Sequence, residues 1–104
     1  MSGEMRLNEV FMVGRIAQGP MKTEDGLTHL MVEGLRSSEP FHCVCDGRTA
    51  ENLNEHCNAG DEVSVEGQLR WMAFPNTGRT LVIYARFISY GRKIRSVSPR
   101  IGDS

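Results

Sequence analysis

Five side chains of the types that bind metal ions fall within sixteen residues of this 104-residue chain: His42, Cys43, Cys45, His56 and Cys57. Structural zinc sites usually take their cysteines from turns of the form Cys-x(2–4)-Cys. Cys43 and Cys45 instead stand two apart in an alternating segment. Cys57 follows the apolar spacing of a short helical segment, where a free cysteine packs as a small hydrophobic residue. We therefore predict buried thiols and no metal site.

Residues arranged for covalent or acid–base catalysis are missing from the sequence. It contains no Cys-x-x-Cys, no Gly-x-Ser-x-Gly and no glycine-rich phosphate loop. Neighbouring carboxylates such as Asp61 and Glu62 stand in a predicted turn, where solvated carboxylates are common. We predict that the protein is not an enzyme and needs no cofactor.

Charge is divided unevenly along the chain, although its net value is only −1 at pH 7. Residues 1–66 contain 5 Lys/Arg and 12 Asp/Glu, whereas residues 67–104 contain 7 Lys/Arg and one Asp. Ten of the twelve basic residues are arginine, which stacks on planar groups and forms paired hydrogen bonds with phosphate. This predicts an anionic partner for the C-terminal part. The alternative is that basic strands are neutralised by acidic strands of the same fold.

The spacing of apolar residues predicts five strands and one helix. Alternation is clearest at Val63, Val65, Gly67 and Leu69, as in a half-buried antiparallel strand. Apolar positions three and four apart follow Thr49, a residue type that caps helices. Turn residues such as Gly19-Pro20 separate the segments, and residues 81–90 are almost continuously apolar, as expected for a strand flanked on both sides. The predicted order is strands at about 8–18, 27–36 and 40–46, a helix at 49–57, and strands at 61–73 and 79–90.

This order is typical of the OB-fold, an all-β, five-stranded Greek-key barrel, here with one short helix between strands 3 and 4. A small closed sheet needs glycine where a strand coils sharply. Gly14 and Gly67 stand in mid-strand on the inward side, as that coiling requires. We assign residues 1–90 to the barrel domain and residues 91–104 to a short basic tail, which we expect to be flexible.

The chain also predicts a cytoplasmic protein. No apolar run approaches the roughly 18 residues that a bilayer span requires. The N-terminus lacks the basic-then-apolar pattern of a secretory signal. Three cysteines are an odd number and a low density, which fits a reducing compartment better than a disulfide scaffold. We expect no membrane partner.

Three segments resemble the bacterial and mitochondrial single-stranded DNA-binding proteins (SSB). Residues 60–70 resemble the family's fourth strand, with the pattern Gly-x-x-Val-x-Val-x-Gly-x-Leu-Arg. Residues 8–16 look like its first strand, and residues 41–45 with 50–53 are similar to its third strand and helix. The resemblance covers roughly residues 8–90. It implies an OB-fold that associates into homodimers or homotetramers and binds single-stranded DNA without strong sequence preference.

The resemblance also implies which residues touch DNA. Phe41 and Phe74 fall where the family has stacking aromatics, and Arg70 matches the arginine that ends the fourth-strand pattern. Alternation places Arg70, Met72 and Phe74 on the face opposite Val63, Val65 and Leu69. The complete predicted set of nucleic-acid-binding residues is Arg15, Arg36, Phe41, Arg70, Trp71, Phe74, Arg79, Tyr84 and Arg86.

Each of these residues also has a purely structural interpretation. The arginines can be solvated and paired with glutamates, and the two phenylalanines can lie at a rim or a subunit interface. Trp71 has the parity of the core, so it is a candidate for core, interface or stacking platform. Tyr84 and Arg86 share one side of their strand, which favours a cation–π pair between them.

In this family such binding supports DNA replication, recombination or repair. The family normally ends in an acidic, Phe-terminated tip that recruits proteins, whereas this chain ends in a short basic segment. Primosomal replication protein N, a tail-less relative, fits that difference. The alternative function is therefore a replication adaptor that bridges replication proteins and binds single-stranded DNA more weakly. An SSB of a phage or mobile element is a further interpretation.

Overall fold

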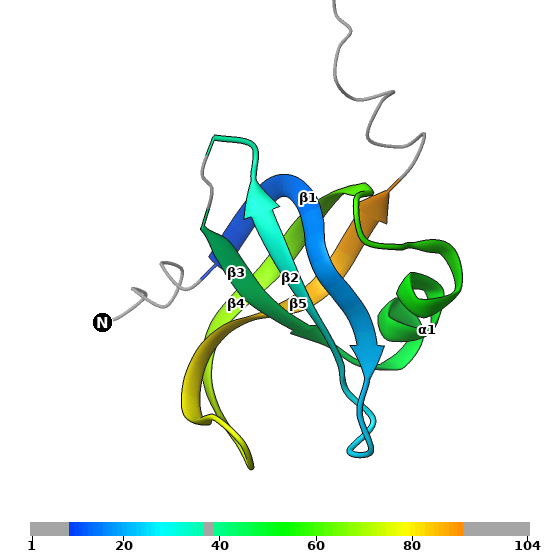
Figure 1. The fold of residues 1–104 in the computed structure, drawn as a ribbon. Helices are drawn as coiled ribbons and strands as arrows, with labels where there is room; N and C mark the ends of the chain where they lie inside the picture. Colours follow the sequence, from blue (N-terminus) through cyan, green and yellow to red (C-terminus); the bar gives the residue numbers. More distant parts are fainter. Residues whose placement is uncertain (1–8, 37–38, 91–104) are drawn as a thin grey trace, which may run out of the picture.

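The computed structural model describes residues 9–36 and 39–90. Its strands close into a barrel in the order β1-β2-β3-β5-β4, with only the β3–β5 pair parallel (Figure 1). This arrangement, with a helix between β3 and β4, confirms the predicted fold class. The predicted basic tail, residues 91–104, lies outside the described residues. The elements are β1 (Glu9–Lys22), β2 (Thr28–Gly34), β3 (Pro40–Cys45), α1 (Gly47–His56), β4 (Glu62–Phe74) and β5 (Gly78–Tyr90).

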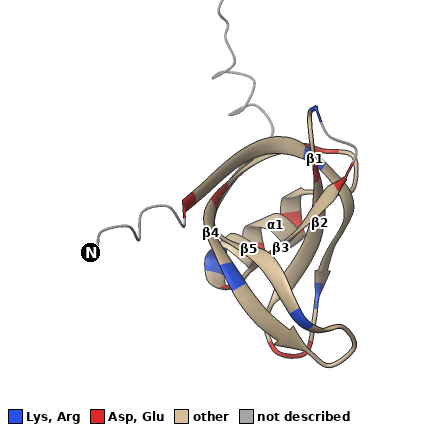
Figure 2. Ribbon diagram, turned by 90° about the vertical axis from the view of Figure 1, so that its left-hand side faces the viewer, with Lys and Arg blue, Asp and Glu red and all other residues tan. Residues whose placement is uncertain are grey.

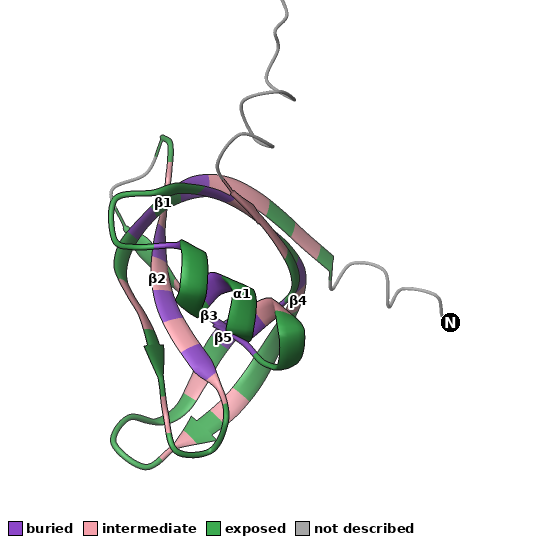
Figure 3. Ribbon diagram, turned by 90° about the vertical axis from the view of Figure 1, so that its right-hand side faces the viewer, coloured by how far each residue is buried: buried purple, intermediate pink, exposed green. Residues whose placement is uncertain are grey.

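Small and branched apolar side chains fill the barrel, and α1 covers one of its ends (Figure 3). The helix contributes Ala50 and Leu53, and Cys57 follows directly after it. Leu53 is completely buried, so the helix is held by its apolar side rather than by its helix propensity. The strands contribute Ile16, Leu30, Val32, Cys43, Cys45, Val63, Val65, Ile83 and Ala85.

Two glycines sit where neighbouring strands approach too closely for a side chain. A Cβ atom on Gly14 would lie 2.1 Å from the Glu33 carbonyl oxygen, and one on Gly67 would lie 2.1 Å from the Tyr84 carbonyl oxygen. The strand pairing of β4 with β5 also shifts register between Glu66 and Gly67, which increases the local coiling. The predicted role of these glycines is confirmed.

Among the differences from the predicted bounds, those of β1 and α1 have a structural reason. β1 runs through the expected turn at Gly19-Pro20 to Lys22, because two register shifts let it stay paired with β2. The helix begins at Gly47 rather than Thr49, and its N-cap, Asp46, forms no capping side-chain hydrogen bond. The predicted Thr49 cap is wrong: its hydroxyl donates a 3.0 Å hydrogen bond to the Arg86 carbonyl and so ties α1 to β5.

The β4–β5 hairpin extends beyond the closed part of the barrel. Among the described residues, which begin at Glu9, β1 pairs with β4 as far as Gln68, and β4 continues beyond Gln68 paired with β5. Leu69, in this part of β4, is 38% exposed, although alternation predicts it inside. β5 is flanked on both sides, by β3 and β4, as predicted, although its side chains Leu81 and Phe87 are exposed.

All three cysteines are free and buried, as predicted. Burial raises the pKa of Cys43 and of Cys45 to about 12 and that of Cys57 to about 11. Because the thiolate is the reactive form, the folded protein should react very slowly with Ellman's reagent at pH 8. We expect three rapidly reacting thiols after addition of guanidinium chloride and none before. Rapid labelling of the folded protein would contradict this burial.

Candidate nucleic-acid interface

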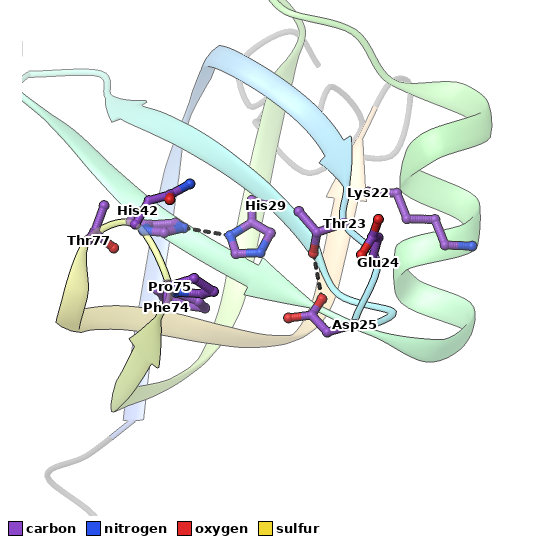
Figure 4. Close-up of a pocket in the computed structure, with 10 residues that line it drawn as sticks. Lys22, Thr23, Glu24, Asp25, His29, His42, Phe74, Pro75 and Thr77 are labelled. Atoms are coloured by element: carbon purple, nitrogen blue, oxygen red, sulfur yellow. Dashed lines mark hydrogen bonds between the residues drawn. The ribbon is translucent and has the colours of Figure 1, made fainter.

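A groove of about 620 Å³ lies between the β1–β2 loop and the β4–β5 turn (Figure 4). Its floor is formed by His29 of β2 and His42 of β3. The outer face of strands 2 and 3, between these two loops, is where OB-folds bind oligonucleotides. The two walls are Lys22, Thr23, Glu24 and Asp25 on one side and Phe74, Pro75, Asn76 and Thr77 on the other.

The two histidines and Phe74 form a ring cluster in this groove. His29 Nδ1 and His42 Nε2 are 2.9 Å apart and share a hydrogen bond. The Phe74 ring lies 5.1 Å from the His29 ring in an edge-on contact and 5.5 Å from the His42 ring, centroid to centroid. Partial burial, and then the neighbouring His29, lower the pKa of His42 and so favour its neutral form.

The position of Phe74 depends on the curl of the hairpin. Val44 and Val82 have the outward parity of β3 and β5, yet both are fully buried. Val44 is the neighbour of His29 across the sheet, and Val82 is the neighbour of Arg70. The tip of the hairpin has therefore folded over the outer face of the sheet. This brings Phe74 to the two histidines.

Hydrogen bonds within the β1–β2 loop fix its shape. The Thr23 hydroxyl donates to Asp25, and the Leu27 amide donates to the same Asp25 oxygen at 3.1 Å. These hydrogen bonds, led by that from Thr23, lower the pKa of Asp25. The Thr23 amide also donates to the Leu27 carbonyl at 2.9 Å. This wall of the groove is therefore preformed and acidic.

Arg70 stands on the same face of β4 as Phe74, as predicted, and is held by an aromatic ring. Its guanidinium carbon lies 4.3 Å from the centre of the Tyr84 ring. The Tyr84 hydroxyl donates a hydrogen bond to Asp46, and that bond raises the pKa of Tyr84. The predicted pairing of Tyr84 with Arg86 is therefore wrong, because Arg70 crosses from the neighbouring strand to occupy the ring.

Trp71 and Arg79 lie on the opposite face of the hairpin. The Arg79 guanidinium carbon is 4.5 Å from the centre of the Trp71 ring, and Trp71 is 58% exposed. The core interpretation of Trp71 is therefore excluded. Leu81 is the neighbour of Trp71 across the two strands, and both Leu81 and Leu69 are exposed on this face.

The other four predicted residues lie away from the groove. Arg15 is on β1 and pairs with Glu62 of β4 at 3.3 Å, as the structural interpretation of the arginines expects. Arg36 follows the end of β2 that is remote from the groove. Phe41, at the start of β3, is 50% exposed. Arg86 borders a separate hollow with Glu9, Phe11 and Glu66.

The arrangement of charge favours one side of this interface. Residues 67–90 contain Arg70, Arg79 and Arg86 and no carboxylate. Figure 2 shows basic positions on both strands of the hairpin, and the first half of β4 also contains two acidic residues, Glu62 and Glu66. Acidic residues also line the groove itself, on the side of the β1–β2 loop, where Glu24 and Asp25 stand beside Lys22. A polyanion would be attracted to the hairpin and repelled by part of the loop.

Of the ten residues that line the groove, sequence reasoning predicted only Phe74, and His29, His42 and Lys22 are among those that it missed. His29 and His42 occupy outward positions of the second and third strands, the face that OB-folds use. Alternation could therefore have found both histidines once the fold was predicted. It could not have predicted the contact of Phe74 with both rings, because that contact depends on the curl of the hairpin.

The metal-binding alternative of the sequence does not form. Cys43 and Cys45 point into the barrel, whereas His42 lies on its outer face. His56 is exposed on α1, with its Nε2 atom 3.4 Å from Glu55. No group of three or more His, Cys, Asp or Glu within residues 9–36 and 39–90 is placed to hold a metal ion. In the same part of the chain, no helix has the length and hydropathy to cross a bilayer.

Comparison with known proteins finds single-stranded DNA-binding proteins among those similar to this chain. No family model matches the sequence. Among curated proteins, the single-stranded DNA-binding protein of Malacoplasma penetrans (strain HF-2) is 34% identical over 73 residues, which cover 61% of this chain. This chain spans 38% of the length of that relative.

Solved structures of single-stranded DNA-binding proteins and of PriB have a similar fold. The N-terminal domain of PriB protein from Thermoanaerobacter tencongensis is 25% identical, with a TM-score of 0.64 over 82% of this chain and 97% of that one. The second single-stranded DNA-binding protein of Mycobacterium smegmatis is 20% identical, with a TM-score of 0.69 over 89% of this chain and 94% of that one. This chain has the OB-fold of the single-stranded DNA-binding proteins.

The predicted resemblance to the SSB family is thereby confirmed. The mitochondrial single-stranded DNA-binding protein of S. cerevisiae shares the fold at 18% identity and a TM-score of 0.63, over 79% of this chain and 92% of that one. These relatives belong to a non-enzymatic class of OB-fold proteins, in agreement with the prediction that the chain is not an enzyme.

Proposed function

We propose that this protein binds single-stranded DNA along its groove and over the adjoining face of the β4–β5 hairpin. The observation that carries the proposal is the placement of Phe74 and Arg70 on one face of that hairpin, beside a groove that crosses strands 2 and 3. The names of the relatives support the same ligand.

Binding would combine stacking with phosphate contacts. A base can stack on Phe74, since every base has a π-face and stacking contributes about 1–3 kcal/mol per base. Arg70 is oriented by Tyr84, which is itself hydrogen-bonded to Asp46, so its guanidinium is available to a phosphate at little cost in side-chain entropy. Trp71 and Arg79 provide a second aromatic and cationic pair on the other face of the hairpin. Neither pair reads a base edge, so sequence preference would be weak.

The cellular role that we propose is in DNA replication, recombination or repair, in the cytoplasm. The free, buried thiols support a reducing compartment. The second candidate is a replication adaptor with weaker DNA binding, in line with the PriB neighbour. The acidic loop wall, with Glu24 and Asp25 facing the groove, favours that alternative because carboxylates repel phosphate.

We further propose that the protein self-associates, as a homodimer or homotetramer. Phe11 and Phe87 are 67% and 61% exposed on the outer face of β1, β4 and β5. Both are paired with Glu66, so they flank one position of β4. The PriB neighbour is described as dimeric. Light scattering on a sizing column, with and without oligo(dT), measures the assembly.

Titration with oligo(dT), followed by the fluorescence of Trp71, the chain's single tryptophan, tests the function. Affinity should fall with salt at a logarithmic slope of roughly −0.7 for each phosphate neutralised. Arg70→Gln should weaken binding and make the slope shallower by roughly one such contact. Arg15→Gln is the matched control: Arg15 pairs with Glu62 away from the groove, so its loss should leave both quantities unchanged.

The same titration separates the two candidate functions. Binding that ignores salt, or no binding at low salt, would refute the DNA-binding proposal and leave the adaptor. Equal effects of Arg70→Gln and Arg15→Gln would show that DNA follows a different face of the barrel.

A further inference from the structure

A second hollow, of about 270 Å³, lies on the outer face of β1, β2 and β3 and shares the two histidines with the groove. Two methionines line it, and the DNA-binding proposal uses neither. Met21 of β1 is paired with His29 of β2, and Met31 of β2 is paired with His42 of β3. Paired side chains on one face of a sheet lie about 4.5–5.5 Å apart at Cβ. The register therefore gathers two thioethers and two imidazoles on one small surface.

The histidine nitrogens face each other across this surface. His29 Nδ1 and His42 Nε2 are 2.9 Å apart, with one proton between them. Bonds from imidazole nitrogen to a first-row ion such as zinc are about 2.0–2.1 Å, so two such ligands stand about 3–4 Å apart, depending on the angle at the metal. Exchange of the shared proton for an ion therefore requires the two rings to separate by about 1 Å or less.

The chemistry of the donor set selects the ion. Thioether sulfur is a soft ligand that favours Cu(I), and imidazole also suits copper. The remaining lining residues, Gln18, Gly19 and Leu30, include no carboxylate that would favour a hard cation. We propose that His29, His42, Met21 and Met31 form a binding site for one Cu(I) ion on the outer face of β1–β3.

A Cu(I) ion can reach this hollow in the folded chain, and the competing thiols are buried. Met21 is 62% exposed, so an ion can reach the hollow without unfolding of the barrel. The three thiols, which are stronger ligands for Cu(I), are buried on the other side of the sheet. The folded chain therefore offers the His–Met site first, and the site does not depend on the proposed DNA binding.

Competition for Cu(I) against bicinchoninate, in anaerobic buffer with ascorbate and without DNA, measures the site. We expect one Cu(I) per folded chain, together with shifts of the Met21 and Met31 methyl signals in ¹H–¹³C NMR spectra. The double variant Met21→Leu/Met31→Leu keeps apolar side chains of similar size and should bind at least about tenfold more weakly, since even partners outside the ligand shell are worth 10–100-fold. His29→Gln should weaken binding at least as much, and His56→Gln, on exposed α1, should have no effect.

Three results with Cu(I) would overturn the proposal: no Cu(I) bound by the folded chain, retention of full affinity by the double methionine variant, or methyl signals that stay in place while Cu(I) binds. Zn(II) added under the same conditions should bind much more weakly, because thioethers are poor zinc ligands. Tighter binding of Zn(II) than of Cu(I) would also contradict the site as proposed.

Discussion

Gly67→Ala is expected to destabilise the barrel by about 3 kcal/mol or more, above the usual cost of an added methylene. The new Cβ would lie 2.1 Å from the Tyr84 carbonyl oxygen and 2.8 Å from the Ala85 Cα atom. Both atoms are backbone of the neighbouring strand, so relief requires β4 and β5 to separate where they pair. For a domain of this size the melting temperature should fall by roughly 12–24 °C, measured by circular dichroism.

Gly26→Ala provides the matched comparison. Gly26 has a φ of +89°, which is unfavourable for alanine, but a Cβ atom there meets no atom within 4 Å. The substitution should therefore add only backbone strain, which lowers the free energy of unfolding by roughly 1–2 kcal/mol. If the two variants melt at the same temperature, close strand contact is not what requires glycine at position 67. Gly14→Ala, whose Cβ would meet the Glu33 carbonyl, should behave like Gly67→Ala.

Phe74→Ala is expected to weaken binding of oligo(dT) roughly 5- to 150-fold, which corresponds to the 1–3 kcal/mol of one stacked base. The ring forms part of the groove wall and lies against His29 and His42, so its removal takes away the stacking surface. The barrel should stay folded, because Phe74 lies outside the core cluster. Fluorescence titration at constant salt measures the loss, and thermal melting checks the fold.

Two further substitutions at Phe74 separate stacking from packing. Phe74→Tyr keeps the aromatic face and should bind nearly as well as the natural sequence. Phe74→Leu keeps an apolar side chain in the ring cluster but has no π-face, so it should lose most of the affinity that alanine loses. Normal binding by Phe74→Ala would remove this residue from the interface, and equal binding by the leucine and tyrosine variants would exclude stacking as its role.

Local patterns predicted most of the fold. Alternation located β4 and β5 to within one residue at each end, and the apolar spacing of Ala50, Leu53 and Cys57 found the only helix of the described residues. These patterns work because burial repeats every two residues in a strand and about every 3.6 in a helix. Element ends were less accurate: β1 continues through Gly19-Pro20, since its pairing with β2 outweighs the local preference for a turn.

The candidate site was predicted in part. Alternation placed Arg70 and Phe74 on one face because both stand in a single strand, where parity alone decides. Alternation failed for Leu69, which is 38% exposed, because parity states which side a residue faces and not how deeply it is buried there. The predicted partner of Tyr84 was also wrong, since the cation over its ring is Arg70 of β4 and not a residue of its own strand.

The amino-acid sequence by itself determined the strands, the helix, the glycines that let the sheet close, and the face on which Arg70 and Phe74 stand. These depend on periodicity and on single-residue sterics, which act over a few neighbouring residues. Only the tertiary structure decided that the hairpin curls over the outer sheet, that Phe74 meets His29 and His42, and that Met21 and Met31 join those histidines. These contacts join residues that are far apart between positions 21 and 74. They depend on the register and coiling of several strands together, which no local pattern specifies.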